Sequence, residues 1–168
     1  KNNLNLKDYF PKIKDDLNFL DQNLKIDYSK KKFSVKGSGD ILIQDKKDKI
    51  NYSISRKENK YEFKSSLNIN DNPFNLKTLN YKKSFNEKAK INIEGIYDLN
   101  KGLILKYISL EEKKKKLLTK NLIFNKKFQI TDLENIELNY FDSNDQKNLI
   151  EIQNKDGKLY LTGKAFNA

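Results

Sequence analysis

The sequence of 168 residues contains no histidine, cysteine, methionine or tryptophan. Without thiolate and imidazole groups, the chain cannot build the zinc and copper sites that rely on them, and it has no Cys nucleophile or His general base. Disulfide bonds are excluded for the same reason. These absences remove most metal-centred and catalytic functions, so we expect neither an enzyme nor a cofactor.

Long hydrophobic runs are missing as well. No stretch approaches the ~20 apolar residues that a membrane-spanning helix needs, and no secretory signal is recognisable. The chain begins with Lys1 rather than Met and stops at Ala168 without a closing signal. We therefore expect it to be a segment of a longer protein.

The apolar content is low. Apolar residues make up 36% of the chain, and adding the 6 Gly residues still leaves it below the roughly 45–50% of ordinary globular proteins. A thick, fully buried core is therefore not expected. The aromatic residues and the Ile and Leu residues are nevertheless placed too regularly for a disordered chain.

The net charge is +11 and the isoelectric point is about 9.5. A charge of this size can indicate binding to nucleic acid or to an anionic surface. However, Arg56 is the only arginine among 34 basic residues, and the chain is also rich in Asn and Ile. Lys, Asn and Ile are encoded by A/T-rich codons, so we attribute much of the charge to genome composition.

The clearest pattern lies between Lys49 and Asn70. Two runs, 50–55 and 61–69, carry apolar side chains at nearly every second residue, and the polar residues 56–60 separate them. Because the side chains of a strand point alternately to opposite faces, each run has one apolar and one polar face. The stretch therefore predicts a β-hairpin with one apolar face.

Similar alternation recurs from Leu24 to the end of the chain. Turn signals follow one another every 8–12 residues or so, which predicts roughly ten to twelve strands in an antiparallel meander. Within 74–82 the apolar residues change phase, and we expect a β-bulge near Thr78, since a slip of one residue would otherwise exchange the two faces. The fold class is therefore all-β, with residues 24–168 forming one repetitive unit.

Residues 1–23 form a different lead-in. Pro11 interrupts any helix or strand that passes through it. After it, Ile13, Leu17 and Leu20 have the i, i+4, i+7 spacing of a short amphipathic helix. Such a helix could cap one edge or end of a sheet, but it is too short to cover the whole apolar face.

Three arrangements can cover that face. The strands can form a second, packed sheet (a sandwich), close into a barrel, or form one long curved sheet whose apolar side is left for a ligand. Alternation and turn spacing do not choose among them.

Several stretches, taken in order, resemble the AsmA-like proteins of the bacterial cell envelope, in particular their YhdP-type branch. The resemblance extends from about Leu24 to the end of the chain. The stretches that carry it are FSVKGSG (33–39), INYSI (50–54), LNYK (79–82), INIEG (91–95), IELNY (136–140) and LYLTGKAFNA (159–168).

This resemblance implies a long antiparallel meander curled into an open groove, of the bridge-like lipid transfer type. Members of the family are anchored in the inner membrane by an N-terminal helix, cross the periplasm and are implicated in carrying phospholipid to the outer membrane. For this chain it implies phospholipid acyl chains as the partner and membranes at the ends of the full-length protein. The anchor helix is not in this segment.

The apolar positions of the strands are then the candidate groove lining, with ordinary sandwich core as the alternative interpretation. We also expect Tyr107 to share the face of Leu103 and Leu105. The candidate lining residues are Ile50, Tyr52, Ile54, Tyr61, Phe63, Leu67, Ile91, Ile93, Leu103, Leu105, Ile136, Leu138, Leu159 and Leu161.

Two other classes of function remain as alternatives. One is a structural β-sandwich or adhesion module. The other is a basic domain that binds nucleic acid or an anionic surface, which would need exposed aromatics among its basic residues. We do not expect nucleic acid, because arginine is nearly absent and most aromatics share the Ile/Leu face. The carboxylates Asp132, Glu134 and Glu137 lie close together in sequence, but we interpret them as solvent-facing rather than catalytic.

Overall fold

The computed structural model describes residues 6–30, 32–84, 87–113, 115–142 and 144–165. Within these ranges the chain is all-β and contains no α-helix, only two short 3₁₀ turns, η1 (Leu6–Asp8) and η2 (Lys77–Leu79). The strands are β1 (Asn18–Ser29), β2 (Lys32–Leu42), β3 (Asp48–Lys57), β4 (Lys60–Ile69), β5 (Asn75–Leu76), β6 (Tyr81–Lys82), β7 (Ala89–Asp98), β8 (Gly102–Glu112), β9 (Lys115–Phe124), β10 (Ile130–Asp132), β11 (Asn135–Phe141), β12 (Lys147–Lys155) and β13 (Lys158–Ala165).

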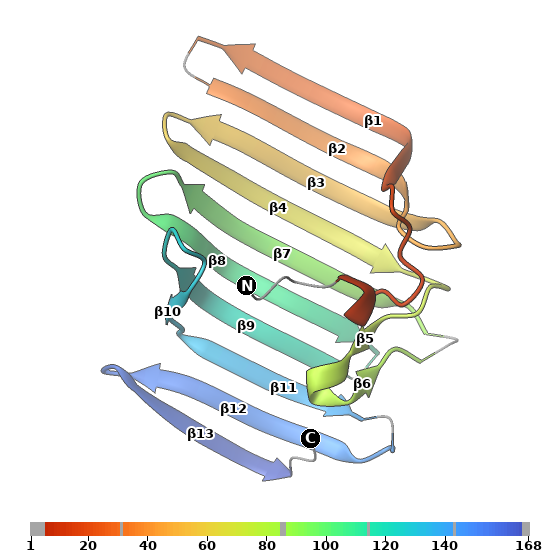
Figure 1. Ribbon diagram of the computed structural model, residues 1–168, viewed down its shortest axis with the longest axis vertical. Coiled ribbons are helices and arrows are strands. Elements are labelled where there is room, and N and C mark those ends of the chain that lie inside the picture. Colours follow the sequence, from red (N-terminus) through yellow and green to blue (C-terminus); the bar gives the residue numbers. More distant parts are fainter. Residues whose placement is uncertain (1–5, 31, 85–86, 114, 143, 166–168) are drawn as a thin grey trace.

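Eleven of these strands form one open antiparallel sheet (Figure 1). The order across the sheet is β1-β2-β3-β4-β7-β8-β9-β11-β12-β13, and β10 pairs with β9 beside this path. The order follows the sequence because most connections are short turns, which join antiparallel neighbours. The predicted open meander is therefore confirmed. The described strands form neither two packed sheets nor a closed barrel.

Alternation along each strand and direct pairing between strands give the sheet one continuous apolar face. In the predicted hairpin, Ile50 lies opposite Leu67. The same row continues through Ile91, Leu110 and Leu117 on the next strands. Directly opposed residues of an antiparallel pair place their side chains on the same face. We call this side of the sheet the apolar face.

The short helix expected around Ile13, Leu17 and Leu20 is wrong. Only η1 forms near the N-terminus, and Leu20 lies in β1, where it pairs with Asp40 of β2. A two- or three-turn helix is marginal on its own, whereas β1 pairs with β2 from Asn18 to Ser29 with a single interruption between Leu20 and Asn23. Because β1 begins at Asn18, the expected boundary after residue 23 falls inside a strand.

The bulge expected near Thr78 is also wrong. Residues 75–82 do not belong to the main sheet; they form the small β5–β6 hairpin, with η2 as its turn. The 3₁₀ turn, which ends at Asn80 in the left-handed conformation, changes the phase of the apolar residues. Phe74 and Tyr81, on either side of it, are both buried.

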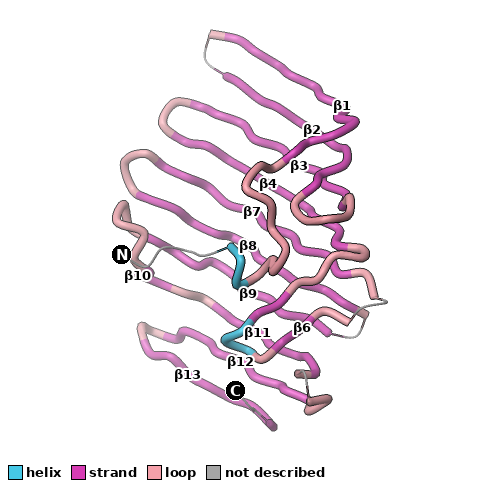
Figure 2. Tube along the Cα trace, turned by 45° about the vertical axis from the view of Figure 1, so that its right-hand side comes forward, coloured by secondary structure: helices cyan, strands magenta, loops and turns pink. Residues whose placement is uncertain are grey.

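This hairpin and the N-terminal lead-in lie together over one end of the apolar face (Figures 1 and 2). The amide of Asn75 donates to the Tyr9 carbonyl (2.9 Å), and the rings of Phe10 and Phe74 meet edge to face at 5.1 Å. Between these segments and the sheet lies the buried core cluster, to which the hairpin region contributes Phe74 and Tyr81 and the sheet contributes Ile69, Ala89, Leu110, Leu117 and Tyr140. The protein thus covers part of its own apolar face. The sequence analysis did not predict that the β5–β6 hairpin would contribute to this cover.

A partly covered apolar groove as the candidate functional site

All fourteen candidate lining residues lie on the apolar face. Cross-strand pairs demonstrate this directly in each part of the sheet: Ile54 is opposite Phe63, Tyr61 is opposite Tyr97, and Ile136 is opposite Ile152. At the last strand, Leu161 pairs with Ile152, and Leu159, two residues earlier, points the same way. The face predicted from alternation is therefore the face that the strands build.

Tyr107 is the exception among the aromatic residues expected on this face. A register shift between β7 and β8 makes Tyr107 the partner of Glu94, while Leu105 pairs with Gly95. The extra residue in β8 turns Tyr107 to the opposite face and brings Ile108 opposite Ile93 on the apolar face. The sequence signal was the apolar alternation that ends at Leu105 and restarts one residue out of phase at Ile108.

The middle of the apolar face forms a row that crosses the sheet at right angles to the strands. From β3 to β13 its members are Tyr52, Ser65, Ile93, Ile108, Thr119, Ile136, Ile152 and Leu161, so two small hydroxyl residues lie among the apolar ones. The buried core cluster lies to one side of this row. On the other side, in the turn that leads to β10, the Phe128 ring stacks on Tyr97 with a centroid separation of 6.5 Å.

An apolar cavity of about 640 Å³ lies where the β5–β6 hairpin meets strands β9 to β13. This volume is within the range of pockets that hold small molecules, roughly 300–1,000 Å³. The cavity is lined by Thr78, Leu79, Thr119, Ile136, Leu138, Ile150, Ile152, Leu161, Gly163 and Lys164. Five of its aliphatic residues come from neighbouring strands of the sheet and Leu79 from the hairpin, so the cavity is a stretch of groove with a partial roof.

The roof is held by two tyrosines. Tyr140 Oη, on β11, donates to the Leu79 carbonyl at 2.7 Å. Tyr81 Oη, on β6, donates to the Glu112 carboxylate at 2.5 Å, and Glu112 also accepts from the Ser84 amide at 2.8 Å. Burial would raise the pKa of Glu112, but these hydrogen bonds outweigh it and hold the pKa below its usual value. Each end of the hairpin is thereby tied to the sheet.

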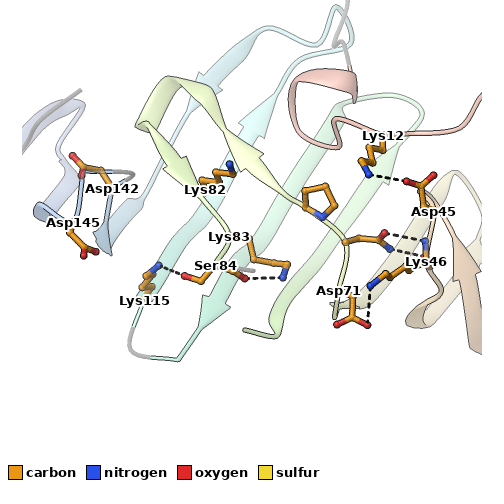
Figure 3. Close-up of a pocket in the computed structure, with 12 residues that line it drawn as sticks. Lys12, Asp45, Lys46, Asp71, Lys82, Lys83, Ser84, Lys115, Asp142 and Asp145 are labelled. Atoms are coloured by element: carbon orange, nitrogen blue, oxygen red, sulfur yellow. Dashed lines mark hydrogen bonds and ion pairs between the residues drawn. The ribbon is translucent and has the colours of Figure 1, made fainter. Parts of the chain in front are cut away.

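A polar cavity of about 630 Å³ lies beside the covered end (Figure 3). Its deepest lysine, Lys83, donates from Nζ to the carbonyls of Asn70 (2.7 Å), Glu87 (2.7 Å) and Ser84 (3.1 Å). Burial lowers the pKa of Lys83. An ammonium group has three donors, and all three are used on backbone carbonyls. Lys83 therefore fixes the chain around the hairpin and has no donor left for a ligand.

The three carboxylates weighed as catalytic candidates do not converge. Asp132 accepts from Asn154 Nδ2 at 2.7 Å, Glu134 accepts from Asn121, and both are exposed. Glu137 lies opposite Glu151 and Leu118 on the far side of the sheet from the groove. Among the residues that the structure describes, no cluster of three or more acidic side chains could hold a metal ion.

The fold and the face define the protein as an open, single-sheet β-groove. In the described part of the chain, no helix has the length and apolarity needed to cross a membrane. No protein-family model, no curated protein and no solved structure matches this chain.

Proposed function

We propose that this chain is a segment of an AsmA-like, YhdP-type envelope protein that shields phospholipid acyl chains in its groove. In this proposal the full-length protein is anchored in the inner membrane and crosses the periplasm. The groove then forms part of a bridge along which phospholipid moves between the inner and outer membranes.

The observation that carries the proposal is the largely apolar face that extends across the strands of an open sheet. Along its middle row, Ile93 and Ile136 are only half-buried, and Leu161 at the edge is 71% exposed. Apolar surface left in water costs roughly 25 cal/mol per Å², and each methylene of an acyl chain gains about 0.8 kcal/mol on burial. An acyl chain laid along the row would remove from water both the exposed apolar side chains of the row and its own methylene groups.

The direction of the groove supports transport rather than storage. The row runs across the strands to β13 at one edge and, beyond Tyr52, through Gly37 on β2 to Leu24 on β1 at the other edge, so no end wall closes it in the described sheet. The lining of the cavity is mainly aliphatic, and its polar side chains are those of Thr78, Thr119 and the single lysine Lys164. A lipid can therefore move along the row at little cost, with its headgroup on the wet, open side.

Lipid that co-purifies with the chain tests the proposal. The chain would be expressed in bacteria, purified without detergent and extracted for mass spectrometry, and we expect phospholipid or fatty acid in the extract. Tyr52→Asp and Leu105→Asp place a charge in the groove and should abolish lipid recovery. Asn51→Asp, an exposed position on the other face of the same strand as Tyr52, is the matched control and should keep it. A folded, stable wild-type chain that carries no lipid would contradict the proposal.

A further inference from the structure

The turns at one end of the strands are strongly basic. Five turns lie at this end, on the left of Figure 1, and with one flanking strand residue on each side they span residues 29–32, 57–60, 98–102, 124–130 and 155–158. Their described residues include nine lysines and three acidic residues, and all nine lysines are exposed. We call these turns the basic rim. Strands added beyond β1 or β13 in a longer protein would lengthen this rim and leave it uncovered.

The lysines of the basic rim are not neutralised within the protein. None of those described forms an ion pair with another described residue. At the opposite end of the strands, by contrast, Lys46 pairs with Asp71, and Glu112 lies opposite Lys115 with 3.4 Å between Oε2 and Nζ. The genome composition can set how many lysines the chain contains, but it does not explain why one end leaves them unpaired.

Like charges also lie directly opposite each other at the basic rim. Lys57, at the end of β3, is the direct partner of both Lys32 on β2 and Lys60 on β4. Lys155 and Lys158 repeat this arrangement in the β12–β13 hairpin. Like charges directly opposed across a ladder are destabilising. A bound anion would reduce this repulsion, so the rim is suited to a negatively charged partner.

Arg56, the only arginine of the chain, is held at the same end of the sheet, on the apolar face. Its direct partner on β4 is Tyr61, and its guanidinium carbon lies 5.4 Å from the centroid of that ring. Its Nε donates to the Glu58 carbonyl at 3.2 Å. A guanidinium carries five N–H donors in a rigid fork that fits two phosphate oxygens at once. The donors on the two Nη atoms have no partner among the described residues, so they are available to an anion.

A cavity of about 520 Å³ lies at the basic rim, between the β1–β2 and β3–β4 turns. Its volume is within the range of pockets that hold small molecules. Four basic residues line it, Lys30, Lys32, Arg56 and Lys57, together with the aromatic residues Tyr28 and Phe33. Phe33 is the direct partner of Arg56 and shares the apolar face with it. The cavity therefore joins a cluster of cationic groups to the apolar face.

We propose that this cavity binds the phosphate of an anionic phospholipid headgroup, with Arg56 as the main contact, while the acyl chains lie on the apolar face. The inference rests on the proposed function, since it takes the same lipid and adds a site for its headgroup. The lead-in and the β5–β6 hairpin lie over the other end of the strands, so they leave this end open to the headgroup (Figures 1 and 2).

The length of a phospholipid fits the distance between the cavity and the middle row. Arg56 and Tyr52 are on the same strand, and the four residue steps between them span roughly 13 Å. A single phospholipid spans roughly 20 Å, half the thickness of a bilayer with its headgroups. A lipid whose phosphate is bound by Arg56 therefore reaches the middle row with its acyl chains.

The charge around the cavity selects the class of lipid. A zwitterionic headgroup such as phosphocholine would bring its own cation against Lys32 and Lys57, whereas phosphatidylglycerol brings only the negative charge of its phosphate. We therefore expect phosphatidylglycerol to bind in preference to phosphatidylcholine. Nucleic acid also offers phosphates, but it has no acyl chains to cover the apolar surface beside the cavity.

Flotation of the full chain with phospholipid vesicles tests the proposal at physiological ionic strength. The wild type should float with vesicles that contain phosphatidylglycerol and not with vesicles of phosphatidylcholine alone. Arg56→Gln should weaken the binding about fivefold, the upper value for an exposed charge pair. Arg56→Lys, which keeps the charge without the fork, should restore only part of it. Lys46→Gln makes the same change of charge as Arg56→Gln at the opposite end of the strands and should bind like the wild type.

Flotation reports the headgroup contact whether or not the groove holds a lipid, so the two proposals can fail separately. A chain that carries no co-purified lipid, yet depends on Arg56 to bind these vesicles, would contradict the acyl-chain path and support the headgroup site. Equal binding to both kinds of vesicle, or equal losses in Arg56→Gln and Lys46→Gln, would overturn the headgroup site. Release of the chain by random-sequence single-stranded DNA or by inorganic phosphate, at equal phosphate concentration and ionic strength, would overturn it as well and assign the rim to nucleic acid or to free phosphate.

Discussion

The ring of Tyr52 occupies the space into which a side chain at Gly37 would project. A Cβ built on Gly37 would overlap Cζ and Oη of the ring and lie 2.7 Å from Cε1. The two residues are direct partners across β2 and β3, so the tyrosine lies over its neighbouring strand and helps to form the floor of the groove. A residue of any other type at position 37 would lift this ring.

Gly37→Ala should therefore destabilise the protein through Tyr52 alone. We expect a loss of about 1–3 kcal/mol in the free energy of unfolding, the usual cost of overpacking. In the background of Tyr52→Ala the obstacle is gone, and the same glycine substitution should be close to neutral. Urea unfolding of the four proteins of this double-mutant cycle measures the coupling. Equal costs in both backgrounds would mean that the ring does not depend on the glycine.

The hydrogen bond between Tyr81 and Glu112 should contribute to the attachment of the β5–β6 hairpin. Tyr81→Phe leaves a buried carboxylate without its shortest partner, so we expect a loss of about 1–3 kcal/mol in unfolding free energy. Tyr28→Phe removes the same hydroxyl from a strongly exposed side chain on β1 and should change stability little. Similar losses in both variants would argue against a special role for the buried pair.

Glu112 should also make stability depend on pH. Its folded pKa lies below the ordinary value of 4.5, so its contribution is complete above that pH and is lost as the pH falls through the folded pKa. The difference in unfolding free energy between the wild type and Glu112→Gln should therefore stay constant above pH 4.5 and shrink as the pH falls from there through the folded pKa. Denaturant unfolding across this range gives the difference directly. A difference that stays constant with pH would show that the carboxylate is not held ionised by its partners.

The buried core cluster should carry more stability than the aromatic contact on the other side of the groove. Phe74→Ala removes a buried ring that packs on Phe10, and we expect a loss of about 3–5 kcal/mol. Phe128→Ala removes a ring of the same size that is 63% exposed above Tyr97 and should cost less than about 1 kcal/mol. Denaturant unfolding of both variants measures the two losses. Equal losses would mean that the cover over one end is not the main core.

The open meander and its apolar face could be predicted from the sequence because both follow from local alternation. Residues such as Ile50, Tyr52 and Ile54 alternate without interruption, and a period of two fixes which side each points to. The bulge in β8 was missed because Tyr107 extends the apolar alternation of Leu103 and Leu105 by one more position, and only the restart at Ile108 shows that the phase has changed.

The cover over one end of the groove was missed for a different reason. Its contacts join segments far apart in the sequence, as when Tyr9 accepts a hydrogen bond from Asn75 and Leu79 accepts one from Tyr140. Periodicity reports on a strand and its neighbours, whereas these contacts depend on where the folded sheet places the two segments. The polar contacts of Lys83 and Glu112 were missed for the same reason, because a charged residue next to a chain reversal gives no sign in the sequence that it will be buried.

Photo-crosslinking of lipid to single positions on the sheet tests the central claim most directly. A benzophenone amino acid would replace Ile93, in the middle row of the groove, or the adjacent Asn92, whose side chain points to the other face. Irradiation in bacteria followed by mass spectrometry should give lipid adducts at position 93 and none at position 92. Adducts at neither position, or equally at both, would contradict the account of this face as a path for acyl chains.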